Sequence, residues 1–92
     1  NFNGTGTVAI RASFGVSSIF DNGVGDYTVN FAASNVMPDA NFCAQATAAG
    51  NATGATDITA KPFLFTTTSV RMATTSNAVQ ADMDNIGVAI FR

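Results

Sequence analysis

The fold is decided by one stretch of the sequence, which reads Asp21-Asn22-Gly23-Val24-Gly25-Asp26-Tyr27-Thr28-Val29-Asn30-Phe31. Within it, Asn22-Gly23 predicts a hairpin turn, because both residue types tolerate positive φ. After the turn, the apolar residues Tyr27, Val29 and Phe31 alternate with polar ones and so occupy one face of a strand. Two antiparallel strands joined at this turn are the best-founded structural prediction for the chain.

Strand signals also dominate the rest of the sequence. Glu is absent, and Lys and Leu each occur once, so the residues that favour helices are nearly missing. Turn residues recur at short intervals between runs rich in Thr, Val, Ile and Phe, as in a sandwich or a barrel. The further strands are expected over residues 7–12, 42–48, 58–66, 69–74 and 85–91. We therefore predict an all-β fold, an antiparallel β-sandwich of about seven strands.

Alternation near the N-terminus predicts which side chains face the core. Val8 and Ile10 share one face of the first strand, and Phe14 and Val16 share one face of the segment that follows. Phe20 is a candidate for the same side as Phe14. These residues are therefore expected to be core residues.

The later strands carry three special features. Residues 42–48 place alanines on one face, whose small side chains allow another sheet to approach closely, and Cys43 on the other, as a buried or half-buried thiol. Pro62 cannot donate to a central ladder, so its strand is expected to be broken or at an edge. Phe63 and Phe65 are expected to share a face that is buried at a subunit interface or, alternatively, exposed as an apolar patch.

The composition points to self-association of a single domain spanning residues 1–92. Apolar residues make up 47% of the chain and charged residues 11%, against about 25% charged in typical proteins. A domain of this size buries only about 60–65% of its unfolded surface. One cysteine and no histidine exclude an internal disulfide and an adequate zinc ligand set. Oligomerisation is the remaining source of stability, and a monomer coated in Thr, Asn and Ser is the alternative.

Several classes of protein are disfavoured by the same sequence. Its net charge is −2 and its four basic residues are scattered, so we expect no nucleic-acid partner. No apolar run approaches the roughly 20 residues of a spanning helix, so we expect no membrane insertion. The start at Asn1, without Met or a signal peptide, indicates a piece cut from a longer protein. The apolar run over residues 88–91 is typical of a closing strand, so we expect a C-terminal piece.

The sequence contains few side chains suited to catalysis, and we expect no enzyme activity and no cofactor. Histidine is absent, which excludes His-based catalysis, and Cys43 therefore has no histidine to activate it. Asp21, Asp26 and Asp39 lie beside turn residues, where carboxylates commonly accept local backbone hydrogen bonds. Asp82 and Asp84 lie two apart and could form half of a calcium site or an acid pair across an interface, although solvated loop carboxylates fit better. We therefore expect no metal site.

Parts of the sequence resemble the C-terminal domain of bacteriophage tail fibres. The resemblance rests on residues 2–14, 16–19, 21–31 and 37–42, on the late strand Ser69-Val70-Arg71, and on the ending Val88-Ala89-Ile90-Phe91-Arg92. It implies a homotrimeric head at the distal end of a tail fibre in the virion. It also implies contact with a host surface polysaccharide, lipopolysaccharide or outer-membrane protein. No catalytic motif of that family can be carried over to this chain.

The segments that match the family poorly are the expected receptor surface, since binding commonly lies on loops held by a rigid sheet. These segments are residues 44–61 and 74–85, and they contain the polar loops 50–57 and 75–84. The candidate receptor-binding residues are Asn51, Thr53, Thr56, Asp57, Asn77, Gln80 and Asp82. The alternative function is a structural cap that trimerises the fibre without touching a receptor. An enzyme that trims polysaccharide is a weaker third option.

Overall fold

The computed structural model describes residues 1–11, 13–49, 58–76, 79–83 and 85–91. The five-stranded sheet contains β3 (Val16–Gly23), β4 (Asp26–Phe31), β6 (Ile58–Phe63), β7 (Ser69–Ser76) and β8 (Val79–Gln80). The four-stranded sheet contains β1 (Phe2–Asn3), β2 (Ala9–Ile10), β5 (Cys43–Ala49) and β9 (Asn85–Phe91). A short 3₁₀ helix, η1 (Ala33–Asn35), lies in the connection from β4 to β5.

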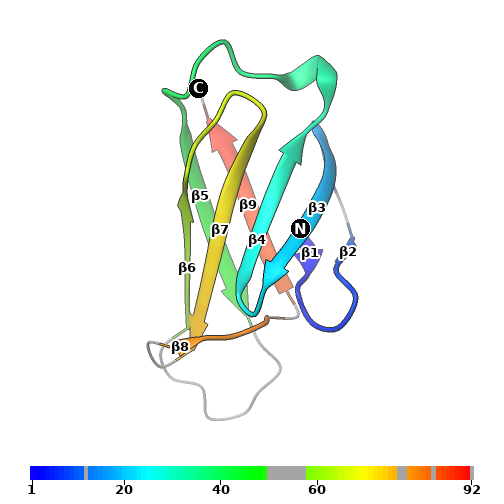
Figure 1. Cartoon of the computed structure of the whole chain (residues 1–92), viewed down its shortest axis with the longest axis vertical. Coiled ribbons are helices and arrows are strands. Elements are labelled where there is room, and N and C mark those ends of the chain that lie inside the picture. The colour runs from blue at the N-terminus through cyan, green and yellow to red at the C-terminus, as the bar shows by residue number, and fades with distance from the viewer. Residues whose placement is uncertain (12, 50–57, 77–78, 84, 92) are drawn as a thin grey trace.

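Two antiparallel sheets face each other (Figure 1). Their strand orders are β2-β1-β9-β5 and β3-β4-β7-β6, with β8 pairing only with β7. Every strand pair is antiparallel, and the chain crosses between the sheets after β2, β4, β5 and β8. The prediction of an all-β antiparallel fold is confirmed. Within the described residues, no helix has the length and apolar character needed to cross a membrane.

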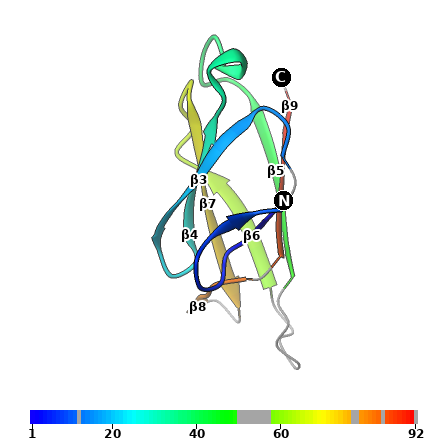
Figure 2. The ribbon, with the colours of Figure 1, turned by 90° about the vertical axis from the view of Figure 1, so that its right-hand side faces the viewer.

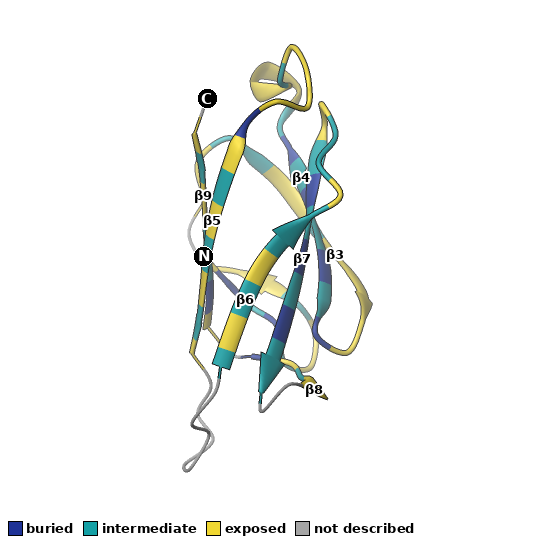
Figure 3. Cartoon of the chain, turned by 90° about the vertical axis from the view of Figure 1, so that its left-hand side faces the viewer, coloured by how far each residue is buried: buried dark blue, intermediate teal, exposed yellow. Residues whose placement is uncertain are grey.

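The hairpin strand β4 supplies the centre of the core, as its alternation predicts. Tyr27, Val29 and Phe31 are buried, whereas the residues between them are half-buried. β7 repeats the pattern beside it with buried Val70 and Met72. Figure 3 shows this alternation of buried and half-buried residues along β7. The remaining buried apolar residues of the core are Phe2, Phe42, Met83 and Ile86.

The β3–β4 hairpin is confirmed, but the predicted position of its turn is wrong. Gly23 pairs with Asp26, so the loop consists of Val24 and Gly25, and Asn22-Gly23 ends β3. Gly25 has a φ of +64°, and a Cβ at this position would lie 2.5 Å from the carbonyl oxygen of Thr74. Close approach to β7 therefore requires glycine at position 25, and the turn lies two residues later than predicted.

The predicted N-terminal apolar faces are only partly correct. The register of β3 shifts between Val16 and Ser18, so Val16 and Ile19 pack against the core. The side chains of Phe14 and Phe20 are 96% and 62% exposed, so the prediction that they face the core with Val16 is wrong.

The first predicted strand is also shorter than expected. Only Ala9–Ile10 of residues 7–12 form a strand among the described residues, and Ile10 is exposed while Val8 packs on the core.

The strands β5 and β9 pair along seven positions and agree with the predicted faces. Ala44, Ala46 and Ala48 pack against the core, as do Val88 and Ile90 of β9. Cys43 points away from this face and is exposed, so the prediction of a buried or half-buried thiol is wrong. It pairs with the exposed Phe91 at the end of the ladder.

The strand that contains Pro62 lies at the edge of its sheet, as predicted. Phe63 and Phe65 do not share a face, however. The strand ends at Phe63, and Leu64 adopts a positive φ of 50°, which turns the chain. Phe65 consequently contacts the core residue Phe42 with ring centroids 5.0 Å apart, whereas Phe63 lies beside Arg71.

Candidate functional site

One side of the two-sheet structure is closed and the other is open. On the closed side, β5 and β6 contact each other across the sheets. On the opposite side the short strands β1 and β2 extend the four-stranded sheet beyond β9, and β3 forms the edge of the other sheet. Figure 2 looks onto this side, where the β1–β2 hairpin lies in front of the strands behind it. The sheets separate here around an apolar groove.

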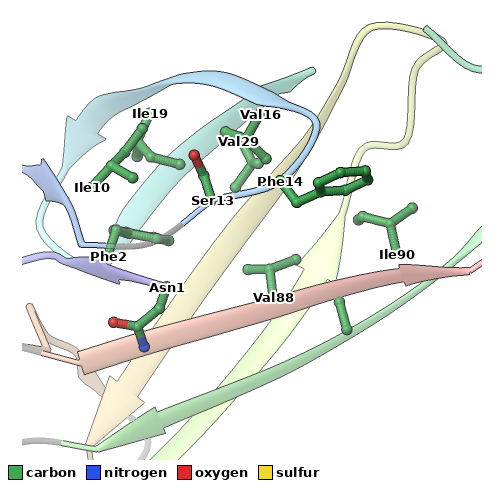
Figure 4. Close-up of a pocket in the computed structure, with 11 residues that line it drawn as sticks. Asn1, Phe2, Ile10, Ser13, Phe14, Val16, Ile19, Val29, Val88 and Ile90 are labelled. Atoms are coloured by element: carbon green, nitrogen blue, oxygen red, sulfur yellow. The ribbon is translucent and has the colours of Figure 1, made fainter. Parts of the chain in front are cut away.

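The groove has a volume of about 590 Å³. It lies between β3 and β4 on one side and β9 with the β1–β2 hairpin on the other, as Figure 4 shows. Its apolar lining consists of Phe2, Ile10, Phe14, Val16, Ile19, Val29, Val88, Ala89 and Ile90. The two polar lining residues are Asn1 and Ser13. Pockets of about 300–1,000 Å³ are typical of ligand sites, but ligand sites also carry several converging polar groups, and this groove has few.

Phe14 is the most unusual residue of the groove. It comes from the connection before β3 and is 96% exposed, although phenylalanine is among the most strongly buried residue types. In Figure 4, Val88 and Ile90 of β9 point toward this connection. An exposed ring at the mouth of an apolar groove is typical of a surface that another protein covers.

Among the described residues, the strand beside the groove, β9, is paired along only part of one edge. β1 pairs with β9 only at Phe2 and Ile86, and β5 occupies the other edge of β9. Within the described residues, Val88–Phe91 therefore has no strand partner on the side of the groove. Unpaired strand edges readily accept another strand.

The described lining of the groove contains few reactive side chains. No Asp, Glu, Lys, Arg, Cys or Tyr side chain belongs to its lining. Acid–base catalysis requires such groups, and the Ser13 hydroxyl, a potential nucleophile, has none of them in the described lining to activate it. The described residues also contain no group of three or more Cys, Asp or Glu side chains that could hold a metal ion. The described lining of the groove is therefore mainly apolar.

The predicted receptor-binding residues lie mostly outside the described part of the chain. Those outside are Asn51, Thr53, Thr56, Asp57 and Asn77. Gln80 is described, and it is an exposed residue of β8 that pairs with Thr75. Its availability agrees with a surface role, and binding by these loops stays a prediction.

Asp82 has a structural contact that sequence reasoning missed. Its Oδ1 atom accepts a hydrogen bond of 2.8 Å from the backbone N–H of Gly25 and lies 2.8 Å from the Tyr27 hydroxyl. Burial and, after it, the hydrogen bond to Asp82 raise the pKa of Tyr27. Asp82 therefore ties the 79–83 segment to the β3–β4 turn. Because Gly25 is 57 residues away, no local sequence signal could have revealed the contact.

The other aspartates mostly follow their predicted turn roles. The carboxylate of Asp21 accepts the Gly23 N–H at 3.1 Å, and that of Asp39 accepts the Asn41 N–H at 2.8 Å. Asp26 differs, because it forms a bidentate ion pair with Arg71 on the neighbouring strand β7. Asp84, which could form half of a calcium site with Asp82 but is expected to be a solvated loop carboxylate, lies outside the described residues.

Comparison of the chain with protein-family models, with curated protein sequences and with solved structures found no significant match.

Proposed function

We propose that this chain is the receptor-binding tip of a bacteriophage tail fibre, which works as a homotrimer at the distal end of the fibre in the virion. The receptor is a polysaccharide, a lipopolysaccharide or an outer-membrane protein of the host surface. The proposal draws its biological assignment from the sequence resemblance of residues 2–42 and of the last strand. The all-β fold and the charge-poor composition agree with it.

The observation that carries the trimer is the exposed Phe14 beside an apolar groove and an unpaired strand edge. Covering an aromatic ring removes apolar surface from water and contributes about 25 cal/mol per Å². The same contact in three subunits would close the open side of each. Charged residues are correspondingly scarce, because part of each surface faces another copy.

The trimer is tested by sedimentation of the purified domain. We expect a mass near three times the 9.4 kDa of one chain. Phe14→Ser should shift the equilibrium toward monomer, whereas Val36→Ser, which replaces an apolar residue that is also exposed but outside the groove, should leave the trimer intact. A wild-type monomer at micromolar concentration would remove the proposal of a trimer.

Receptor binding is tested on susceptible bacteria. The trimer should bind them saturably and should block adsorption of the phage, since three weak sites gain avidity together. A correctly folded trimer that does neither would contradict a receptor-binding tip.

A structural cap is the second candidate function, because self-association alone would account for the apolar groove. As a cap, the domain would tolerate alanine at Asn51, Thr53, Asn77 and Gln80 with no change in adsorption. Deletion of the whole domain would leave the fibre monomeric. A receptor-binding tip predicts instead that the alanine variants still form trimers but adsorb less.

A further inference from the structure

The outer face of the five-stranded sheet carries an ordered polar surface framed by two aromatic rings. Residues that pair across an antiparallel ladder lie on the same face. Phe63 pairs with Arg71, Arg71 with Thr28, and Thr28 with Phe20. One row therefore crosses β6, β7, β4 and β3 on the side opposite the core, with an aromatic ring at each end. At about 4.8 Å per strand this row is about 14 Å long.

The middle of the row is held rigidly by an ion pair. Arg71 donates from Nε to Oδ1 of Asp26 at 2.8 Å and from Nη2 to Oδ2 at 2.6 Å. The guanidinium carbon lies 5.5 Å from the centre of the Phe63 ring. The hydrogen bonds from Arg71 lower the pKa of Asp26, so this carboxylate stays ionised. Side chains fixed in this way lose little further freedom when a ligand binds.

Amide side chains extend the polar surface along β3 and β4. The Nδ2 atom of Asn22 donates to Oγ1 of Thr28 at 2.7 Å, and that of Asn30 donates to Oγ of Ser18 at 3.1 Å. Among the described residues, no hydrogen bond engages the Oδ1 atoms of these two amides or Nη1 of Arg71. The surface thus offers both donors and acceptors, the combination that sugar hydroxyls need.

Charge on this face favours an acidic partner. Lys61 is exposed, pairs with Ala73 and so lies on the same face as Arg71, two residues before Phe63. Within the described residues no carboxylate forms an ion pair with Lys61, since the salt bridge found there joins Arg71 to Asp26. Among the described residues, two positive charges, on Lys61 and Arg71, therefore lie beside one negative charge, on Asp26, in a chain whose net charge is −2.

We propose that this outer face, centred on Arg71 and Asp26, binds a polysaccharide that contains acidic sugars. The apolar C–H face of a sugar ring packs on Phe20 or Phe63, because an aromatic ring offers a large flat apolar surface. Hydroxyls bond to the Arg71–Asp26 pair and to the amides, and Lys61 binds the sugar carboxylate. The assignment rests on the proposed function, since it names the receptor class and places recognition on the sheet as well as on the loops.

A glycan array tests this assignment. Bacterial surface polysaccharides are immobilised in native form and after chemical reduction of their carboxyl groups, and the wild-type domain is compared with Phe20→Ser, Lys61→Gln and Val36→Ser. Each altered residue is exposed, so the variants should fold. The wild type should bind at least one acidic polysaccharide and should lose about tenfold in affinity on carboxyl reduction, which corresponds to the loss of one charged contact.

The variants distinguish stacking on Phe20 from binding of the sugar carboxylate by Lys61. Phe20→Ser should lower affinity about tenfold for native and reduced polysaccharide alike, since stacking does not need the carboxylate. Lys61→Gln should lower it only for the native form, and Val36→Ser should change neither. The Phe20→Ser variant must remain a trimer by sedimentation. Its conversion to monomer would show that the face is a subunit interface and would overturn the assignment, as would unchanged glycan binding by both variants or no binding by the wild type.

Failure of this assignment is distinguishable from failure of the proposed function. Wild-type trimers that bind cells and block phage adsorption, but bind no polysaccharide, would refute only the glycan face. Domains that bind acidic polysaccharide but do not block adsorption would refute the tail-fibre tip and leave the glycan face standing.

Discussion

The hydroxyl of Tyr27 lies 2.8 Å from Oδ1 of Asp82, and this contact joins the central strand β4 to the 79–83 segment. The same hydroxyl lies 2.9 Å from the carbonyl oxygen of Gly4 and shares its single proton between the two acceptors. Tyr27 is fully buried. A single side chain therefore links β4, the segment containing Gly4 and the 79–83 segment, which lie far apart in the sequence.

Removal of this hydroxyl should destabilise the domain. Tyr27→Phe leaves the buried carbonyl of Gly4 and one bond of Asp82 unsatisfied, so the free energy of unfolding should fall by about 1–3 kcal/mol. Chemical denaturation measures the change. Because Tyr27 and Asp82 share one bond, the double variant Tyr27→Phe/Asp82→Ala should cost less than the sum of the single variants. Strict additivity would contradict the coupling.

Alkaline titration offers an independent check. Burial, followed by the bond to Asp82, raises the pKa of Tyr27 above its ordinary value of about 10. The stabilisation from the protonated phenol is complete below that value and is lost as the pH rises through the folded-state pKa. Tyr27 is the chain's one tyrosine and Trp is absent, so tyrosinate absorbance reports this group alone. Ionisation near pH 10 in the folded protein would contradict the burial.

At Gly25, the free-energy cost of the close contact with β7 can be measured separately from the cost of the positive φ. Gly25 and Gly6 have φ values of +64° and +60°, but a Cβ would lie 2.5 Å from the Thr74 carbonyl oxygen at Gly25 and near no atom within 4 Å at Gly6. Gly6→Ala should therefore cost about 1 kcal/mol, the penalty of the left-handed conformation. Gly25→Ala should cost that amount and about 1–3 kcal/mol more. Equal losses in thermal or chemical denaturation would mean that the contact with β7 is unimportant.

Met72 at the centre of β7 should be far more sensitive than an exposed apolar residue of the same region. Met72 is fully buried, whereas Val79 in β8 is exposed. Met72→Ala removes packed atoms from the core and should lower the free energy of unfolding by about 2–5 kcal/mol. Val79→Ala should change it by less than about 0.5 kcal/mol. If chemical denaturation gave similar losses for the two substitutions, Met72 would not be part of the stabilising core.

The ion pair between Asp26 and Arg71 predicts a pH-dependent difference between two proteins. The hydrogen bonds from Arg71 lower the folded-state pKa of Asp26 below its unfolded value of about 3.9. Its stabilisation is therefore complete well above that value and is lost as the pH falls through the folded-state pKa. Wild type should be more stable than Asp26→Asn at about pH 6, and the difference should disappear toward about pH 2. A difference that is constant with pH, measured by urea denaturation, would contradict this role.

Much of the fold follows from local sequence patterns. The alternation of Tyr27, Val29 and Phe31 correctly predicts a strand with one buried face, because successive side chains of any strand point to opposite sides. The same reasoning is confirmed for the alanines of β5 and for Ile86, Val88 and Ile90 of β9. The edge position of the strand with Pro62 follows from the missing N–H of proline.

Other features depend on contacts that the local pattern does not contain. The register shift in β3 exposes Phe20, and the positive φ of Leu64 separates Phe63 from Phe65. The apolar groove and the outer face exist only once distant strands are paired. Their residues come from four or more segments, and neither surface could be read from any one of them.

The amino-acid sequence is sufficient to predict antiparallel strands with defined inner faces, because a period of two is a property of neighbouring residues. It determined too that histidine chemistry is absent. Three features appear only in the folded structure: the turn at Val24 and Gly25, the bond between Tyr27 and Asp82, and the exposure of Phe14 and Phe20. The reason is that these features depend on contacts between residues far apart in the sequence, such as the hydrogen bond between Gly25 and Asp82. A pattern of neighbouring residues contains no information about such contacts.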